Sequence, residues 1–252
     1  MSDSDQKLFE YLLRLGDDLL VLGHRLSEWC GHAPVLEEDI ALSNIALDCV
    51  GQGANLLTLA AELRGDTTAD QLAYFREAID YRNCLLVEQP NGDFASTIVR
   101  QFFFDYYTHL LYGKLKFSTH LRLAGIAQKN VKEIDYHLRH SGQWMLRLGD
   151  GTEESHARAQ RAVNDLWPFT GEFFETDEIE LILSKSGVGI QSDILKSEWM
   201  LGVSDLLTRA TLEVPPESPM RFGGRHGRHS EHLGHMLAEM QILARSFPEA
   251  TW

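Results

Sequence analysis

The amino-acid sequence predicts an all-α fold, namely a four-helix bundle with additional C-terminal helices. Only 7 of the 252 residues are proline, so long segments carry no helix breaker. Apolar residues recur at intervals of three and four, whereas the alternation that is typical of strands is almost missing. Four long helical segments with short connections are typical of a helix bundle. We therefore expect a single helical domain over residues 1–252.

The first half of the chain supplies three of the four long helices. The first covers residues 4–30 and ends at "CGHAP", because Gly and Pro together stop a helix. The second covers residues 37–64 and ends at "RGD", and a shorter helical piece follows at 69–79. After the turn "EQPNGD", the third long helix begins near Phe94 and continues through "TIVRQFFFDYYTHLLYGKLKF".

The second half begins with the fourth long helix, residues 131–148, which ends at "GDG". Thr152 is the expected N-cap of the helix that follows. Further helices are predicted at 153–167, 177–183, 191–211 and 230–247.

Composition excludes several classes of function. The formal net charge is −14 with a pI near 5.2, and such a field repels nucleic acids and anionic membrane surfaces. The N-terminus shows no signal-peptide pattern, and no apolar run is long enough to span a bilayer. The 3 cysteines form no C-x-x-C pair, which indicates reduced thiols. A cytoplasmic protein is therefore expected.

Two of the predicted helices are apolar almost all round, yet each carries one thin polar line. These lines face either water or each other inside the bundle, and periodicity alone leaves both interpretations open. On the second helix the line contains Asn44, Asp48, Gly51, Asn55, Thr58 and Glu62, and on the third it contains Gln101, Asp105 and Thr108.

The ligand motif of di-iron bundles is nearly missing from these lines. Such bundles need two Glu-x-x-His motifs, but Gly51 stands where the second helix would offer the histidine. On the fourth helix Glu133 is followed by His137, one residue too late. The one complete match begins at Glu153 and ends at His156, just after a turn, where its acid favours a helix N-terminus. The sequence therefore predicts no metal site here.

Longer motifs carry a family resemblance. The runs "DYHLRHSGQWMLRLGDGTEESHARAQRAVNDLWPFTGEFF" and "GGRHGRHSEHLGHMLAEMQILARSFPEATW", with "ALSNIALDCVGQG" and "RQFFFDYYTHLL", resemble the structural subunits of bacterial phenylacetyl-CoA epoxidases. These subunits form a ferritin-like family, and the resemblance covers essentially the whole chain.

The resemblance implies a place in phenylacetate catabolism. It implies that a homologous catalytic subunit holds the di-iron centre, and that this chain pairs with that subunit and stabilises it without metal, cofactor or catalytic residue. The NADPH-dependent monooxygenase complex would epoxidise the ring of phenylacetyl-CoA. Electrons would come from a reductase subunit with flavin and an iron–sulfur cluster.

At the positions where the catalytic relative would offer ligands, this sequence has Asp48, Asp105, Glu133 and His137. Asp17 and Asp18 are the nearest acids on the first helix. We expect the first four to be remnants of a site that now pair with one another in the interior, because buried charges persist only when paired. The alternative is a metal-binding oxidoreductase active in its own right at these four residues.

The C-terminal region contains two further candidates. His232, His235 and Glu239 could share a helix face and ligate zinc, which would indicate a metal-binding or regulatory module. On the preceding glycine-rich loop, Arg221, Arg225 and Arg228 could contact acidic groups of a partner or an acyl-CoA phosphate. The simpler expectation for this loop is a solvated surface segment.

Overall fold

The computed structural model of the protein describes residues 2–216 and 219–250. These residues contain helices, turns and no strand, so the predicted all-α, ferritin-like class is confirmed. No helix within this part of the chain combines the length and hydropathy needed to cross a bilayer.

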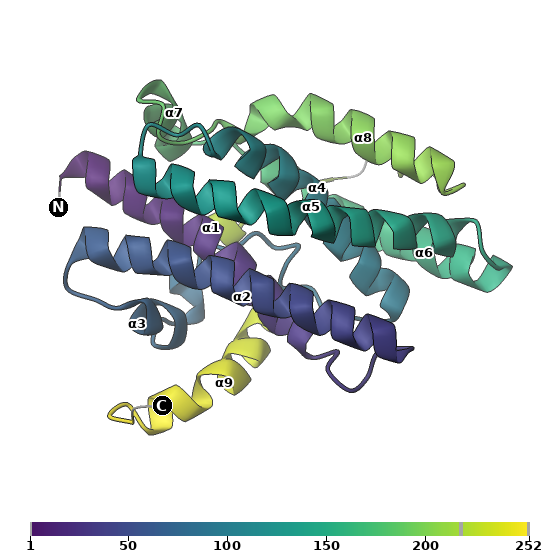
Figure 1. Ribbon diagram of the computed structural model, residues 1–252, viewed down its shortest axis with the longest axis horizontal. Coiled ribbons are helices and arrows are strands. Elements are labelled where there is room, and N and C mark those ends of the chain that lie inside the picture. The colour runs from purple at the N-terminus through teal and green to yellow at the C-terminus, as the bar shows by residue number, and fades with distance from the viewer. Residues whose placement is uncertain (1, 217–218, 251–252) are drawn as a thin grey trace. The chain divides into compact units, whose positions relative to one another are not determined.

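The chain forms two compact units. The first joins the residues up to Pro90 with those from Gly223 onward, and the second contains Asn91–Phe222. Each is built on one antiparallel pair of long helices, α1 with α2 and α4 with α5 (Figure 1). The expectation of one domain over the whole chain stays a prediction.

The first unit contains α1 (Asp3–Ser27), α2 (Leu36–Arg64), α3 (Ala69–Tyr74), η1 (Ala78–Asp80), η4 (Gly224–His226) and α9 (Glu231–Ser246). The second unit contains α4 (Phe94–Leu115), α5 (Leu121–Gly149), α6 (Glu153–Leu166), η2 (Trp167–Phe174), α7 (Glu178–Lys185), η3 (Ser192–Leu195) and α8 (Lys196–Arg209).

Glycines allow α1 and α2 to approach closely. A Cβ atom built on Gly53 would lie 3.1 Å from the carbonyl oxygen of Gly16 and 3.2 Å from the amide nitrogen of Leu20. The backbones therefore touch where the helices cross, which a larger side chain would prevent. Gly65, with φ of +82°, ends α2 in the left-handed conformation, as the "RGD" stop predicted.

An aromatic cluster forms the core of the second unit. Tyr107 stacks on Phe173 with ring centroids 4.5 Å apart, and Phe103 packs against both Trp167 and Trp199. The Trp199 indole Nε1 donates a hydrogen bond of 3.1 Å to the carbonyl oxygen of Phe103, which satisfies the polar atom of a fully buried side chain.

Several predicted boundaries were wrong. The fourth long helix begins at Leu121, ten residues before the predicted start, because the His120 side chain caps it by accepting from the Leu123 amide. The piece predicted at 69–79 ends at Tyr74 and resumes as a short 3₁₀ turn. Thr152 caps α6 as expected, accepting from the Ser155 amide at 3.1 Å.

Two irregular segments pack against each other inside the first unit. Residues 83–89 are buried although they form no helix. The glycine-rich loop at 223–230 lies on them, and a Cβ atom on Gly224 would come within 2.2 Å of the Asn83 carbonyl oxygen. The loop therefore needs glycine at this contact.

Candidate functional site

Asp17 on α1 is fully buried and paired with a cation. The Arg76 guanidinium donates to both of its carboxylate oxygens, with Nη1 2.9 Å from Oδ2. The Arg82 amide donates to the same Oδ2 at 2.8 Å. Tyr81 also packs on this cation, with the Arg76 Cζ atom 4.3 Å from the centre of its ring. Both oxygens of the Asp17 carboxylate thus accept hydrogen bonds from the chain itself.

The neighbouring carboxylate, Asp18, is paired in the same way with a residue from the far end of the chain. Arg225 donates from Nη1 to Oδ1 at 3.0 Å and from Nη2 to Oδ2 at 2.8 Å. The Cys84 amide adds a hydrogen bond of 2.7 Å to Oδ1. Both charged side chains are buried. A paired, bidentate geometry of this kind is what allows two charges to remain inside a protein.

A third interior carboxylate, Glu88, binds the glycine-rich loop. Its Oε1 accepts from the Ser230 amide at 2.6 Å, and its Oε2 lies 2.8 Å from His229 Nδ1 and 3.0 Å from Asn83 Nδ2. The other ring nitrogen of His229 lies 3.1 Å from the Tyr81 carbonyl oxygen. Since both neighbours are acceptors, the imidazole satisfies both only when each nitrogen carries a proton.

In the second unit, the buried Asp105 of α4 has two neutral donors. Gln101 Nε2 lies 2.6 Å from its Oδ1, and Ser141 Oγ donates to its Oδ2 at 2.7 Å. Burial raises the pKa of Asp105 to about 6, against the opposing effects of His137, Ser141 and Gln101. His137 on α5 is itself buried. The structure therefore brings together two of the four predicted remnant residues, Asp105 and His137.

The other two predicted remnants, Asp48 and Glu133, are less buried than Asp105 and His137. Glu133 is half-buried one turn before His137 on α5, and Asp48 is half-buried on α2, in the other compact unit. Most of the polar line of α2 is exposed, including Gly51. The line on α4 is buried. The two polar lines thus differ: the water-facing interpretation holds for most of the α2 line and the interior one for α4.

Sequence reasoning missed the residues that hold these acids. Arg76 and Ser141 were not predicted to bind these acids, and Arg225 was expected on a solvated loop or in contact with a partner. That expectation is wrong for Arg225, because the loop folds inward and the arginine neutralises Asp18. Arg221 and Arg228 are exposed, as expected. The signal for Ser141 was available, since it lies four residues after His137 on one helix face.

The C-terminal histidines lie on the surface of α9. His232 is half-buried, and His235 and Glu239 are exposed. In the described ranges, no three or more His, Cys, Asp or Glu side chains are grouped so that they could hold a metal ion. His156 of the Glu-x-x-His match is bonded elsewhere, with Nδ1 2.8 Å from the Gly149 carbonyl oxygen.

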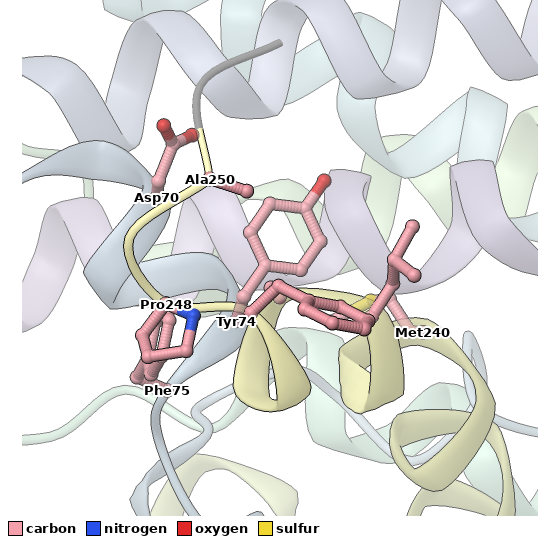
Figure 2. Close-up of a pocket in the computed structure, with 9 residues that line it drawn as sticks. Asp70, Tyr74, Phe75, Met240, Pro248 and Ala250 are labelled. Atoms are coloured by element: carbon pink, nitrogen blue, oxygen red, sulfur yellow. The ribbon is translucent and has the colours of Figure 1, made fainter.

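A cavity of about 460 Å³ opens between α3 and the C-terminal segment of the same unit. Figure 2 shows Asp70 and Tyr74 of α3 and Met240 of α9 among the residues that line it. Its walls are mainly apolar and aromatic, and Asp70 is the one carboxylic side chain in its described lining. The cavity offers no acid–base pair or ligand cluster for chemistry.

These features define a ferritin-like helical protein whose buried carboxylates bind arginine, histidine and neutral donors of the chain itself. The chain belongs to the phenylacetic acid catabolic protein family, which it matches over residues 1–252. It is 50% identical, over 246 residues, to the C subunit of the 1,2-phenylacetyl-CoA epoxidase of Escherichia coli (strain K12). The match covers 98% of this chain and 99% of that relative. The family resemblance predicted from the motifs is confirmed.

Proposed function

We propose that this chain is a non-catalytic structural subunit of a phenylacetyl-CoA epoxidase complex in phenylacetate catabolism. It pairs with a homologous catalytic subunit, stabilises it and shapes the assembled oxygenase. The identity to one subunit of such an epoxidase, along nearly the full length of both chains, supports this role. So does membership of a family of phenylacetic acid catabolic proteins.

One observation supports the non-catalytic part of the proposal: the buried carboxylates of this chain are already bound to other groups of the same chain. A di-iron site in a helical bundle uses about four carboxylates and two histidines that converge on the metals. Here Asp17 and Asp18 bind guanidinium groups, which stay protonated in proteins. An iron ion at either acid would meet a fixed positive charge.

The second unit offers too few further ligands. Asp105 and His137 are buried near each other, but Glu133 is half-buried and the donors around Asp105 are a hydroxyl and an amide. Iron(II) centres of this type select carboxylates and imidazoles. The residues present do not fit a di-iron group, so no step of the reaction is assigned to this chain.

In this proposal the redox chemistry belongs to other subunits. The catalytic homologue holds the di-iron centre and binds the acyl-CoA, and a flavin and iron–sulfur reductase delivers electrons from NADPH. The assembly lies in the cytoplasm. Free thiols at Cys49 and Cys84, both buried, fit a reducing compartment.

Co-expression with the catalytic homologue tests the proposal directly. We expect one stable hetero-oligomer on size analysis, with iron in proportion to the catalytic chain alone. Turnover of phenylacetyl-CoA should require the catalytic chain. Recovery of this chain by itself, with no partner bound, would contradict the scaffold role. Iron bound at Asp48, Asp105, Glu133 and His137, with activity of this chain plus reductase, would instead establish the autonomous oxidoreductase.

A further inference from the structure

One part of this acidic chain has a reversed charge pattern. Acidic residues make up 37 of the 252 positions, about one in seven, so about four would be expected in any 27 residues. Residues 106–132 contain none. The same stretch contains five cations, namely Lys114, Lys116, Arg122, Lys129 and Lys132.

The fold gathers these cations at one end of the second unit. They lie on the last turn of α4, on the connection to α5 and on the first four turns of α5. Gln128 Nε2 donates to the Lys116 carbonyl oxygen at 3.4 Å, and His109 Nδ1 lies 2.9 Å from Asp135 Oδ1. Both contacts fix an antiparallel register that places Lys132 beside the last turns of α4. Residues 114–132 are called the basic turn below.

Two large apolar side chains project from the centre of the basic turn. Phe117 is 78% exposed and Leu121 is 85% exposed. Lys116 Nζ lies 5.2 Å from the centre of the Phe117 ring. Exposed apolar groups surrounded by charge are typical of an interaction site rather than of ordinary surface.

The basic turn is held in one conformation. The Thr119 amide donates to the Gly187 carbonyl oxygen at 2.9 Å, and its hydroxyl donates to the Ser186 carbonyl oxygen at 3.0 Å. The Ser118 hydroxyl donates to the Val188 carbonyl oxygen at 2.7 Å. These bonds attach the turn to the segment after α7. Phe117 is therefore presented by an ordered backbone, which lowers the entropy lost on binding.

The helix dipoles explain the positions of only some of the cations in the basic turn. Lysines near the C-terminus of α4 are favoured by the helix dipole. Arg122 is different, because it is the second residue of α5, where the dipole disfavours a cation, and the first turn of α5 contains no acid. In the described structure, Lys114, Lys116, Lys129 and Lys132 form no ion pair. Their charge is thus available to groups outside the chain.

We propose that the basic turn docks an acidic surface of another protein subunit, with Phe117 and Leu121 entering an apolar hollow on that subunit. This inference rests on the proposed function, since it assigns a face to the assembly. Protein is favoured over an anionic membrane because a membrane extends past the patch and meets the field of the whole molecule, whose net charge is −14. A protein partner meets the basic turn alone.

The test measures the affinity of the purified chain for the catalytic homologue and, separately, for the reductase. The apolar variant is Phe117→Ser with Leu121→Ser, and the charge variant is Lys129→Glu with Lys132→Glu. Matched controls on α8 are Leu201→Ser, since Leu201 is 75% exposed, and Lys196→Glu, since Lys196 is also exposed. Circular dichroism melts show whether each variant keeps its fold.

We expect both basic-turn variants to weaken binding of one of the two partners by about tenfold or more, and the controls to change it by less than about threefold. The charge variant should also flatten the salt dependence of the dissociation constant between about 50 and 300 mM. Equal binding by wild type and both basic-turn variants would overturn the proposal.

Two further outcomes have distinct meanings. If the wild-type chain binds neither partner, the proposed function fails together with this inference. If the wild-type chain binds both partners unchanged by any variant, only the inference fails. Binding to vesicles of phosphatidylglycerol and phosphatidylcholine that the basic-turn variants abolish would overturn protein docking in favour of a membrane contact.

Discussion

Arg225 and Asp18 are 207 residues apart in the chain and form a two-point ion pair inside the first unit. The pair fastens the glycine-rich loop near the C-terminus to the first helix. Arg25 adds to the connection, because its Nη2 donates to carbonyl oxygens of both Glu88 and His232. The buried charges of this unit thus serve to join distant segments.

We predict that breaking this pair on one side is costly. Arg225→Met leaves the Asp18 carboxylate buried without its cation, and Asp18→Asn leaves the guanidinium without its anion. Each should lower the free energy of unfolding by about 3–5 kcal/mol, measured by urea denaturation at neutral pH. The exposed pair of Arg245 with Glu77 provides the control, and Arg245→Ala should cost less than about 1 kcal/mol. Similar losses for all three variants would contradict this prediction.

The second prediction concerns pH. The folded pKa of Asp105 is about 6, above its ordinary value, so the folded state holds a proton that the unfolded state has already released. The contribution of Asp105 to the free energy of unfolding therefore falls as pH rises from about 4 to about 6 and stays at the lower level above that. Asp105→Asn removes this loss, and the variant should gain on the order of 3 kcal/mol over wild type across the same window.

Unfolding free energies at several pH values test this expectation. Ser141→Ala is the matched variant, because removing a donor to the carboxylate raises its pKa further and should steepen the decline. Parallel stability curves for wild type and Asp105→Asn would show that Asp105 does not titrate in this range.

The sequence predicted the fold class and most helices, because burial on one face imposes a period of three to four. It could not predict which polar line faces the interior. The lines through Asp48 and Asp105 have the same spacing, and only packing decides that the second is buried. Partners such as Arg76 and Arg225 were equally out of reach, since no local pattern connects them to Asp17 and Asp18. The predicted start of α5 was wrong because a histidine, His120, caps this helix in place of the usual Ser, Thr, Asp or Asn.

The third prediction distinguishes an effect on the stability of this chain from an effect on turnover. His137→Ala removes a buried imidazole that interacts with Asp105, and we expect a loss of about 1–3 kcal/mol in unfolding free energy. Turnover per assembled epoxidase complex should stay within about twofold of wild type, because in the proposed function this chain supplies no ligand to the metal centre. Asp48→Ala should behave likewise with a smaller loss, since Asp48 is only half-buried. Unchanged stability with abolished turnover would point to a catalytic site instead.

The fourth prediction concerns a glycine at the end of α5. A Cβ atom on Gly149 would lie 2.0 Å from the Ala210 carbonyl oxygen, a backbone atom that cannot swing aside. The Gly149 carbonyl oxygen also accepts from the Thr211 hydroxyl at 3.0 Å, so moving α5 away would stretch that bond. Gly149→Ala should therefore lower the unfolding free energy by about 1–3 kcal/mol.

Gly51 provides the matched control for this substitution. It lies within α2, and a Cβ atom there would meet nothing within 4 Å. Gly51→Ala should raise the unfolding free energy by about 0.5–1 kcal/mol, because alanine loses less backbone entropy in a helix. The two substitutions add the same methyl group, so opposite signs in urea denaturation would show that the contact with Ala210 decides the outcome. A stabilising Gly149→Ala would mean that the end of α5 is free to move away from Ala210.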